Sequence, residues 1–578
     1  MAGPTAPKDP EKARPFFYIL KDKDIFGERQ KDGTGIQFIY ESDGRLINSA
    51  QITGNVTDKE ELRLLETVEG FGRLVHSIGV SVETDRPEET AEFVFQMYGK
   101  KDLYGGGTNL TASLKCDGME HRIYLSDYRW TEDDHVPGQI KILFAAPERM
   151  GKVSVRLFLN DGYEAPPEEE DPVIDMHSEE YCGMISRSLL QLGNPYRIRK
   201  AIEKSKAGKE VTLAYIGGSI TQGAGAIPIH TECYAYKSFQ LFQNRFSTQN
   251  NVRFIKAGVG GTPSELGMIR FDRDVLREGE RPDIVVIEFA VNDEGDETKG
   301  VCYESLVRKV LKLPWKPAVV LLFSVFANDW NLQERLRPVG DLYDLPMVSI
   351  RDAVTPQFSL KCGEGRILSK NQFFYDIFHP NNTGHTIMAD CLQYLFERCD
   401  AAEPARVGTF VEGMTEEQIL SEKLSGPAVI GADFERIFLL DKKNRYVGAK
   451  IRAGGFASTD MELQSVEMDG NLTQTPEFPY NWMYDGSRPQ MAGFEMEIIC
   501  KSLFLIFKDS GETDVGKANV FVNDVYCMTA DPHKNNWLHC NAVLLFWETE
   551  SGSHKVRIAV TEEDRNKKFT ILGFGYTI

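Results

Sequence analysis

The stretch Val211-Thr212-Leu213-Ala214-Tyr215-Ile216-Gly217-Gly218-Ser219-Ile220-Thr221-Gln222-Gly223 decides the fold of the middle of this chain. Its first six residues are mostly apolar, which predicts a buried strand. Gly217 and Gly218 predict a sharp turn, and residues 232–246 can form a helix. We therefore expect Ser219 just past the carboxyl end of a strand, where open α/β sheets bind ligands. A tight turn with a capping serine would explain this stretch equally well.

Two remote stretches favour a catalytic role for the serine. One is the apolar run Val285-Val286-Ile287-Glu288-Phe289-Ala290-Val291, which predicts a second buried strand and is followed by Asn292. The other contains Asp376 and His379, three residues apart. A carboxylate at that spacing can hold the imidazole while the other ring nitrogen reaches a serine hydroxyl. Between them lies a glycine-rich loop, 256–264, which follows a predicted strand.

Serine, glycine loop, strand-end asparagine and Asp-x-x-His occur here in the order that resembles the SGNH (GDSL-like) hydrolase family. The resemblance covers residues 193–399. It implies a doubly wound parallel sheet in a three-layer α/β/α domain, in agreement with the strand–helix alternation of this region. A G-x-S-x-G elbow is absent, because position 221 is Thr, and we find no nucleotide-binding or metal-binding motif.

The resemblance also implies a set of site residues. Ser219 is the expected nucleophile, His379 the base and Asp376 the group that orients it. The expected oxyanion donors are the backbone N–H of Ser219, the backbone N–H of Gly261 and the side chain of Asn292. Gly260 stays an alternative to Gly261, because glycines stand on both sides of that step of the loop.

The chain departs from the family pattern at two places that bear on the site. The usual Gly-Asp-Ser reads Gly217-Gly218-Ser219, so the aspartate that normally braces the serine loop is missing, while the nucleophile is kept. Lys256 stands where the family usually carries an asparagine before the glycine loop. The Gly-Gly-Ser variant resembles bacterial carbohydrate acetyl esterases. His385 lacks an acid three residues earlier, so we interpret it as a hydrogen-bonding residue near a helix start.

The chain length and the changing pattern of predicted helices and strands predict three domains. A chain of 578 residues is too long for one core. Residues 1–175 contain short strands separated by Asp-Gly turns, which predicts an N-terminal β-sandwich or jelly-roll-like module. We expect the catalytic domain at 176–402 and a second β module at 403–578. Residues 164–172 have the composition of a solvated linker.

The composition limits the partners and the location. A net charge of −20 argues against nucleic acid or an anionic membrane as partner. The ten scattered cysteines suggest free thiols in a reducing compartment. The N-terminus does not resemble a secretory signal, and no apolar stretch is long enough to cross a bilayer. A complete chain of this kind is expected to be cytoplasmic.

The sequence thus predicts a serine esterase that removes acetyl or other short acyl groups from hydroxyls of plant-type oligosaccharides through an acyl-enzyme, without cofactor or metal. The alternatives are a short-chain lipid esterase or thioesterase, and a sugar-binding protein without catalysis. Candidate substrate-binding residues are Trp482 and Tyr484, in a turn-like stretch expected to be exposed, and His230 near the serine loop. Further aromatic candidates for sugar stacking are Tyr104, Tyr128, Trp130, Tyr480 and Trp537.

Overall fold

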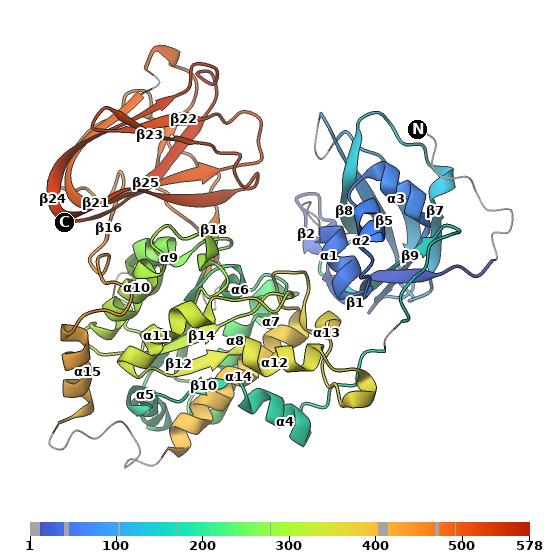
Figure 1. Ribbon diagram of the computed structural model, residues 1–578, viewed down its shortest axis with the longest axis horizontal. Helices are drawn as coiled ribbons and strands as arrows, with labels where there is room; N and C mark the ends of the chain where they lie inside the picture. Colours follow the sequence, from blue (N-terminus) through green and yellow to red (C-terminus); the bar gives the residue numbers. More distant parts are fainter. Residues whose placement is uncertain are drawn as a thin grey trace.

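The structure, a computed structural model, describes residues 12–39, 45–101, 105–168, 170–277, 279–402, 414–468, 473–491 and 493–578. Three bodies follow one another along the chain: a β-rich N-terminal domain, a central α/β domain and a β-rich C-terminal domain (Figure 1). The predicted boundaries at 175/176 and 402/403 stay predictions. Among the described residues, no helix is both long and apolar enough to cross a membrane. The nine cysteines whose side chains the structure describes are free.

The N-terminal domain contains two antiparallel sheets around one apolar core. The first has the order β1-β9-β4-β7 and the second the order β2-β3-β8-β5-β6. Three helices that the sequence analysis did not predict, α1, α2 and α3, also belong to this core, and Asp58 and Thr67 cap the last two. The bounds are β1 Phe16–Phe26, β2 Glu28–Arg29, β3 Gly35–Ile39, α1 Arg45–Ile52, α2 Lys59–Leu64, α3 Val68–Leu74, β4 Val75–Thr84, β5 Thr90–Gly99, β6 Asn109–Lys115, β7 His121–Tyr124, β8 Asp134–Phe144 and β9 Met150–Leu159.

The central domain is built on a six-stranded sheet of order β10-β15-β14-β13-β11-β12. Five strands are parallel, but β10 runs antiparallel to β15, so the sheet is mixed rather than wholly parallel as expected. The strands are β10 Leu189–Gln191, β11 Val211–Gly217, β12 Val252–Gly258, β13 Ile284–Glu288, β14 Ala318–Phe323 and β15 Met347–Ser349. The chain places β12 on one side of β11 and β13 on the other, which makes the carboxyl end of β11 the switch point.

Successive residues of β11 enter two separate apolar cores. Leu213 and Tyr215 pack with α5, α8 and α14, whereas Ala214 and Ile216 pack with α9, α10 and α11. This burial on both faces explains why the strand is a continuous apolar run. The helices of the domain are α4 Glu179–Ser186, α5 Tyr196–Lys206, α6 Ser219–Gln222, α7 Ile229–Glu232, α8 Tyr234–Phe246, α9 Ser264–Phe271, α10 Val301–Leu311, α11 Gln333–Tyr343, α12 Ile350–Phe358, α13 Lys370–Phe373 and α14 Asn382–Ala401.

The C-terminal domain follows helix α15, which opens with the predicted capping box of Thr415 and Gln418. Its main sheet is antiparallel and runs β16-β25-β21-β24-β22-β23, with β17 on β21 and β20 on β25. The bounds are α15 Glu416–Ser425, β16 Phe438–Leu440, β17 Ala449–Arg452, β18 Ser465–Met468, β19 Thr473–Pro476, β20 Trp482–Tyr484, β21 Gly493–Asp509, β22 Ala518–Val522, β23 Val525–Ala530, β24 His539–Val560 and β25 Phe569–Thr577.

Candidate active site

The structure brings the predicted serine, histidine and aspartate together at the carboxyl end of β11. Ser219 is the first residue of α6, and its Oγ lies 3.0 Å from Nε2 of His379. Nδ1 of His379 lies 2.9 Å from each carboxylate oxygen of Asp376. Because a carboxylate only accepts, Nδ1 carries the proton and donates it to Asp376. Nε2 is then free to accept the proton of the serine hydroxyl.

A local turn positions the acid and the base. Asp376 Oδ1 accepts the backbone N–H groups of Phe378 and His379, both at 2.8 Å. An aspartate that bonds backbone groups two and three residues later forms a compact turn, which fixes its own carboxylate. The same carboxylate then meets the imidazole, so this part of the site depends on four consecutive residues and was visible in the sequence.

Buried charged and polar groups brace the serine turn in the absence of the family's usual aspartate. Arg270 is fully buried and donates to the carbonyls of Gly217 and Ala257, both at 2.8 Å. Lys256, 1% exposed, donates to the carbonyl of Gln222 at the end of α6. In the sequence Lys256 is visible only as a departure from the family pattern, and no motif marks Arg270.

A second buried network lies beneath the nucleophile. Thr221 Oγ1 donates to Glu288 Oε2 at 3.1 Å, and burial raises the pKa of Glu288 to about 7. His385 is fully buried, accepts the backbone N–H of Tyr234 and donates to the carbonyl of Ala224. Burial lowers the pKa of His385 to about 3, so its ring is neutral near pH 7. His385 is therefore a hydrogen-bonding residue at a helix start, as expected.

Asn292 lies directly against the turn that carries the nucleophile. It follows β13, and a Cβ placed on Gly218 would lie 2.2 Å from Asn292 Oδ1 and 2.6 Å from Nδ2. Asn292 Oδ1 is buried without a hydrogen-bond partner among the described residues. The carboxamide thus lies beside the residue that precedes the nucleophile, and its role as an oxyanion donor stays a prediction.

The glycine loop after β12 approaches the nucleophile from the other side. A Cβ on Gly260 would lie 3.9 Å from Ser219 Cβ. Gly261 has φ +69, which favours glycine, and lies beside Trp537 and His539 of the C-terminal domain. Neither N–H group of this glycine pair bonds another group within the described ranges. The assignment of Gly261 as donor, with Gly260 as its alternative, stays a prediction.

Two of the predicted substrate-binding residues are core residues instead. Trp482 is 5% exposed and packs edge-on against Phe494, and Tyr484 is fully buried. Both lie on β20, where residues two apart point to the same face. The turn-like residues around them suggested an exposed loop, but the spacing of Trp482 and Tyr484 was the signal for a buried strand face.

The other aromatic candidates differ in how far their side chains are exposed to solvent. Trp130 is buried, the Tyr128 hydroxyl bonds the backbone of Thr111, and Tyr104 lies outside the described residues. Trp537, by contrast, is 44% exposed, and a Cβ on Gly261 would lie 3.0 Å from its ring. Trp537 is therefore the aromatic candidate that lies close to the expected oxyanion loop.

His230 lines a cavity of about 430 Å³ between the N-terminal domain and the serine loop. The N-terminal domain contributes polar groups to the lining, and the central domain contributes residues 225–230 and Tyr375. The cavity wall adjoins the catalytic base, because a Cβ on Gly225 would lie 3.0 Å from His379 Cβ. The N-terminal residues of this lining are Phe26, Glu28, Arg29 and Gln37.

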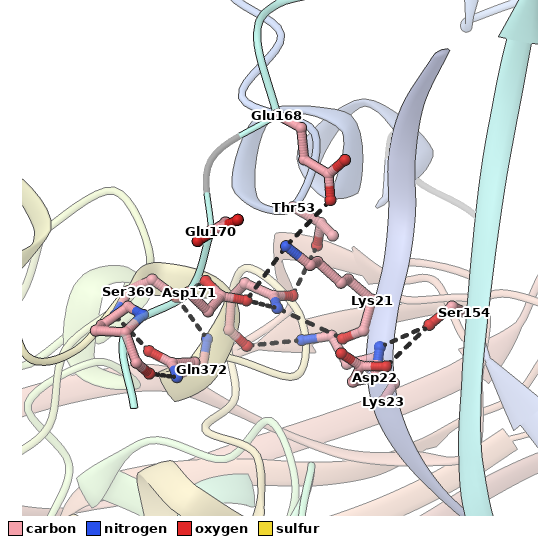
Figure 2. A network of polar contacts seen from close by, with 12 residues as sticks. Lys21, Asp22, Lys23, Thr53, Ser154, Glu168, Glu170, Asp171, Ser369 and Gln372 are labelled. Carbon is pink, nitrogen blue, oxygen red and sulfur yellow. Dashed lines mark hydrogen bonds and ion pairs between the residues drawn. The ribbon is translucent and has the colours of Figure 1, made fainter. Parts of the chain in front are cut away.

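The N-terminal domain is tied to the segment that leads into the Asp376 turn (Figure 2). Lys23 of β1 is 3% exposed and donates to the carbonyls of Asn371 and Phe374. The end of the predicted linker is also held here: Asp171 accepts the Ser369 hydroxyl at 2.5 Å and a side-chain N–H of Asn371 at 3.0 Å. The linker is therefore fixed at its carboxyl end rather than wholly solvated.

Comparison with known proteins finds one family model and several solved structures that are similar to the part of the chain that carries this site. Residues 215–387 match the model of the GDSL-like Lipase/Acylhydrolase family. The fold is similar to that of a two-domain esterase (CEX) active on acetylated mannans, with 23% identity over 68% of this chain and 99% of that chain, and a TM-score of 0.55. The same esterase co-crystallised with mannopentaose gives a TM-score of 0.54, with 23% identity over 68% of this chain and 98% of that one.

A mutant of Axe2, an acetylxylan esterase from Geobacillus stearothermophilus, also matches, with 17% identity over 33% of this chain and 95% of that chain, and a TM-score of 0.25. No curated protein matches the sequence.

Proposed function

We propose that the protein, whose residues 215–387 match the GDSL-like lipase/acylhydrolase family model, is an esterase that removes acetyl groups from the hydroxyls of plant-type oligosaccharides, such as fragments of acetylated mannan or xylan. The two-domain esterase with a similar fold is described as active on acetylated mannans, which makes mannan the first polymer to test.

The reaction follows from the positions of the three central groups. Ser219 Oγ attacks the acetyl carbonyl while His379 Nε2 takes its proton, and Asp376 stabilises the imidazolium through Nδ1. The tetrahedral oxyanion accepts hydrogen bonds from the expected donors, among them the Asn292 carboxamide. When the intermediate collapses, His379 returns the proton to the sugar oxygen and the acetyl group stays on Ser219. Water, activated by His379, then releases acetate and restores the serine.

The observation that carries the choice of a sugar over a lipid is the cavity beside the serine loop. A lipid site would present a largely apolar wall to an acyl chain. This lining combines apolar residues, Phe26 and 226–229, with the polar or aromatic residues Glu28, Arg29, Gln37, His230 and Tyr375. Mixed polar and aromatic groups of this kind suit the hydroxyls and the C–H faces of a sugar ring.

Acetate release from a panel of esters tests the proposal. The panel contains acetylated mannooligosaccharides, acetylated xylooligosaccharides and nitrophenyl esters from acetyl to octanoyl. We expect acetate from at least one oligosaccharide and nitrophenyl rates that fall as the acyl chain grows. Faster turnover of the longer chains, with no release from sugars, would instead identify a lipid esterase or thioesterase. Sugar binding by wild-type protein without turnover of any ester would identify a binding protein.

A matched pair of variants tests the cavity itself. Arg29→Ala removes a cavity residue whose ion pair with Glu148 is exposed and contributes little stability. Arg63→Ala is the control. Arg63 belongs to the same domain, is about as exposed as Arg29 and pairs with Glu60, but it does not line the cavity. We expect Arg29→Ala alone to raise KM for oligosaccharides, while both variants hydrolyse nitrophenyl acetate at the wild-type rate.

A further inference from the structure

The carbonyl groups of both candidate oxyanion glycines are held by side chains of the C-terminal domain. Gln464 Nε2 donates to the Gly260 carbonyl at 2.8 Å, and His539 Nε2 donates to the Gly261 carbonyl at 3.1 Å. Gln464 is 8% exposed and His539 6% exposed, so both bonds lie in the interface between the two domains. Figure 1 shows β18, which begins next to Gln464, against the central domain near α6 and α9.

Each of these side chains is itself fixed in orientation. Gln464 Oε1 accepts the backbone N–H of Cys540 at 3.0 Å, which leaves Nε2 pointing at the loop. His539 Nδ1 lies 3.1 Å from the side-chain NH₂ of Asn535 and must accept from it, so Nε2 carries the ring proton. Burial also lowers the pKa of His539 below its usual range, which favours this neutral form.

Holding a carbonyl also fixes the next N–H group along the chain. In a trans peptide the C=O of one residue and the N–H of the next point in opposite directions. The only cis bond among the described residues is Ile227–Pro228, so the peptide between Gly260 and Gly261 is trans. Glycines adopt many backbone conformations, so this loop does not fix its own peptide planes. The bond from Gln464 therefore sets the direction of the Gly261 N–H.

We propose that Gln464 is a positioning residue for the oxyanion hole: it orients the peptide between Gly260 and Gly261 from the C-terminal domain, with His539 as a second clamp. The inference rests on the proposed esterase mechanism but not on the identity of the sugar. The C-terminal domain thereby takes part in the chemistry of every ester, including esters too small to touch a sugar-binding surface.

The decisive variant is Gln464→Met, which keeps the length of the side chain and removes both its donor to Gly260 and its acceptor for the Cys540 N–H. With nitrophenyl acetate we expect kcat to fall by about 10–100-fold with KM unchanged, because a misplaced donor weakens only the transition state. Inactivation of Ser219 by a nitrophenyl alkylphosphonate should slow by a similar factor, since the P=O oxygen occupies the same hole. The melting temperature should fall, because the Gly260 carbonyl and the Cys540 N–H each lose a buried partner, but the variant should remain folded at the assay temperature.

Glu297→Ala is the matched control. It removes another contact across the same interface, the bond from the Leu544 backbone N–H, and does not touch the glycine loop. We expect wild-type kcat for this variant. Should Gln464→Met fail to fold, His539→Leu removes the neighbouring clamp and is expected to lower kcat in the same way, by a smaller factor.

Two results would overturn the proposal. One is a kcat of Gln464→Met within about twofold of the wild type; the other is a change confined to KM for oligosaccharides, which would make Gln464 a substrate-binding residue. Failure of the proposed substrate is separable from failure of this inference. A wild-type enzyme that hydrolyses nitrophenyl acetate but no acetylated sugar leaves the Gln464 test fully readable.

Discussion

Replacing Gly218 by alanine should displace Asn292 and slow the chemical step. The added Cβ would lie 2.2 Å from Asn292 Oδ1, 2.5 Å from its Cγ and 2.6 Å from its Nδ2. Non-bonded heavy atoms settle at roughly 3.5 Å, so the carboxamide must retreat by about 1 Å. The φ of Gly218 is −87, so the substitution does not require the left-handed region that favours glycine. The effect is therefore steric and is directed at one proposed donor.

The size of the loss follows from that displacement. A misplacement of about 1 Å in a catalytic group costs on the order of 10²-fold in rate, and complete removal of an oxyanion donor costs about 10²–10³-fold. We expect kcat of Gly218→Ala to fall about 10²-fold, equivalent to roughly 3 kcal/mol of activation free energy. KM should change little, since the donor serves the transition state.

The assay is steady-state hydrolysis of nitrophenyl acetate, with thermal unfolding as the test of folding. Gly295→Ala is the control, because Gly295 follows Asn292 by three residues and a Cβ there meets no atom within 4 Å. In an Asn292→Ala background the obstructing carboxamide is gone, so Gly218→Ala should add almost no further loss. Wild-type kcat for a folded Gly218→Ala, or fully additive losses in the double variant, would refute this reasoning.

Three further outcomes are expected. Ser219→Ala should lower ester hydrolysis by several orders of magnitude without lowering the melting temperature; near-normal turnover would remove Ser219 as nucleophile. Trp482→Ala should cost about 3–5 kcal/mol of unfolding free energy in urea titrations, because the indole is a core group; a stable variant impaired only on oligosaccharides would restore it as a binding residue. Burial raises the pKa of Asp293 from 3.8 to about 8, so the native state holds a proton that the unfolded chain releases, and stability falls as pH rises through this window. Melting curves measured between pH 5 and 9 should show a smaller loss of stability with rising pH for Asp293→Asn than for the wild type. Equal losses in the two proteins would exclude a buried, protonated Asp293.

The parts of the site that depend on short sequence spacing were predictable. The Asp376–His379 turn needs two residues three positions apart, and the serine turn needs an apolar strand followed by glycines. The order of the strands then carries Ser219 and Asn292 to the same sheet edge, because parallel strands end together. These features follow from local rules and from the topology of the alternating strands.

The bracing of the site was not predictable, because it depends on residues that only the tertiary structure brings together. Arg270 reaches the Gly217 carbonyl from 53 residues away, and nothing in the sequence around it distinguishes it from a surface arginine. The prediction that Trp482 binds substrate was wrong for a different reason. The turn-forming neighbours of Trp482 suggested an exposed loop, but β20 pairs with β25 in the sheet, and Trp482 and Tyr484 both face the apolar core.

The two flanking domains hold opposite halves of the catalytic machinery. Lys23, from the N-terminal domain, caps carbonyls in the segment that leads to Asp376, and burial lowers the pKa of its ammonium to about 8. Burying the Lys23 ammonium is costly unless it is hydrogen-bonded, and the two carbonyl groups supply those hydrogen bonds. Gln464, from the C-terminal domain, holds the glycine loop. Catalytic groups must keep their positions within about 0.5 Å. A shift of the first domain would therefore disturb proton transfer, whereas a shift of the second would disturb stabilisation of the oxyanion.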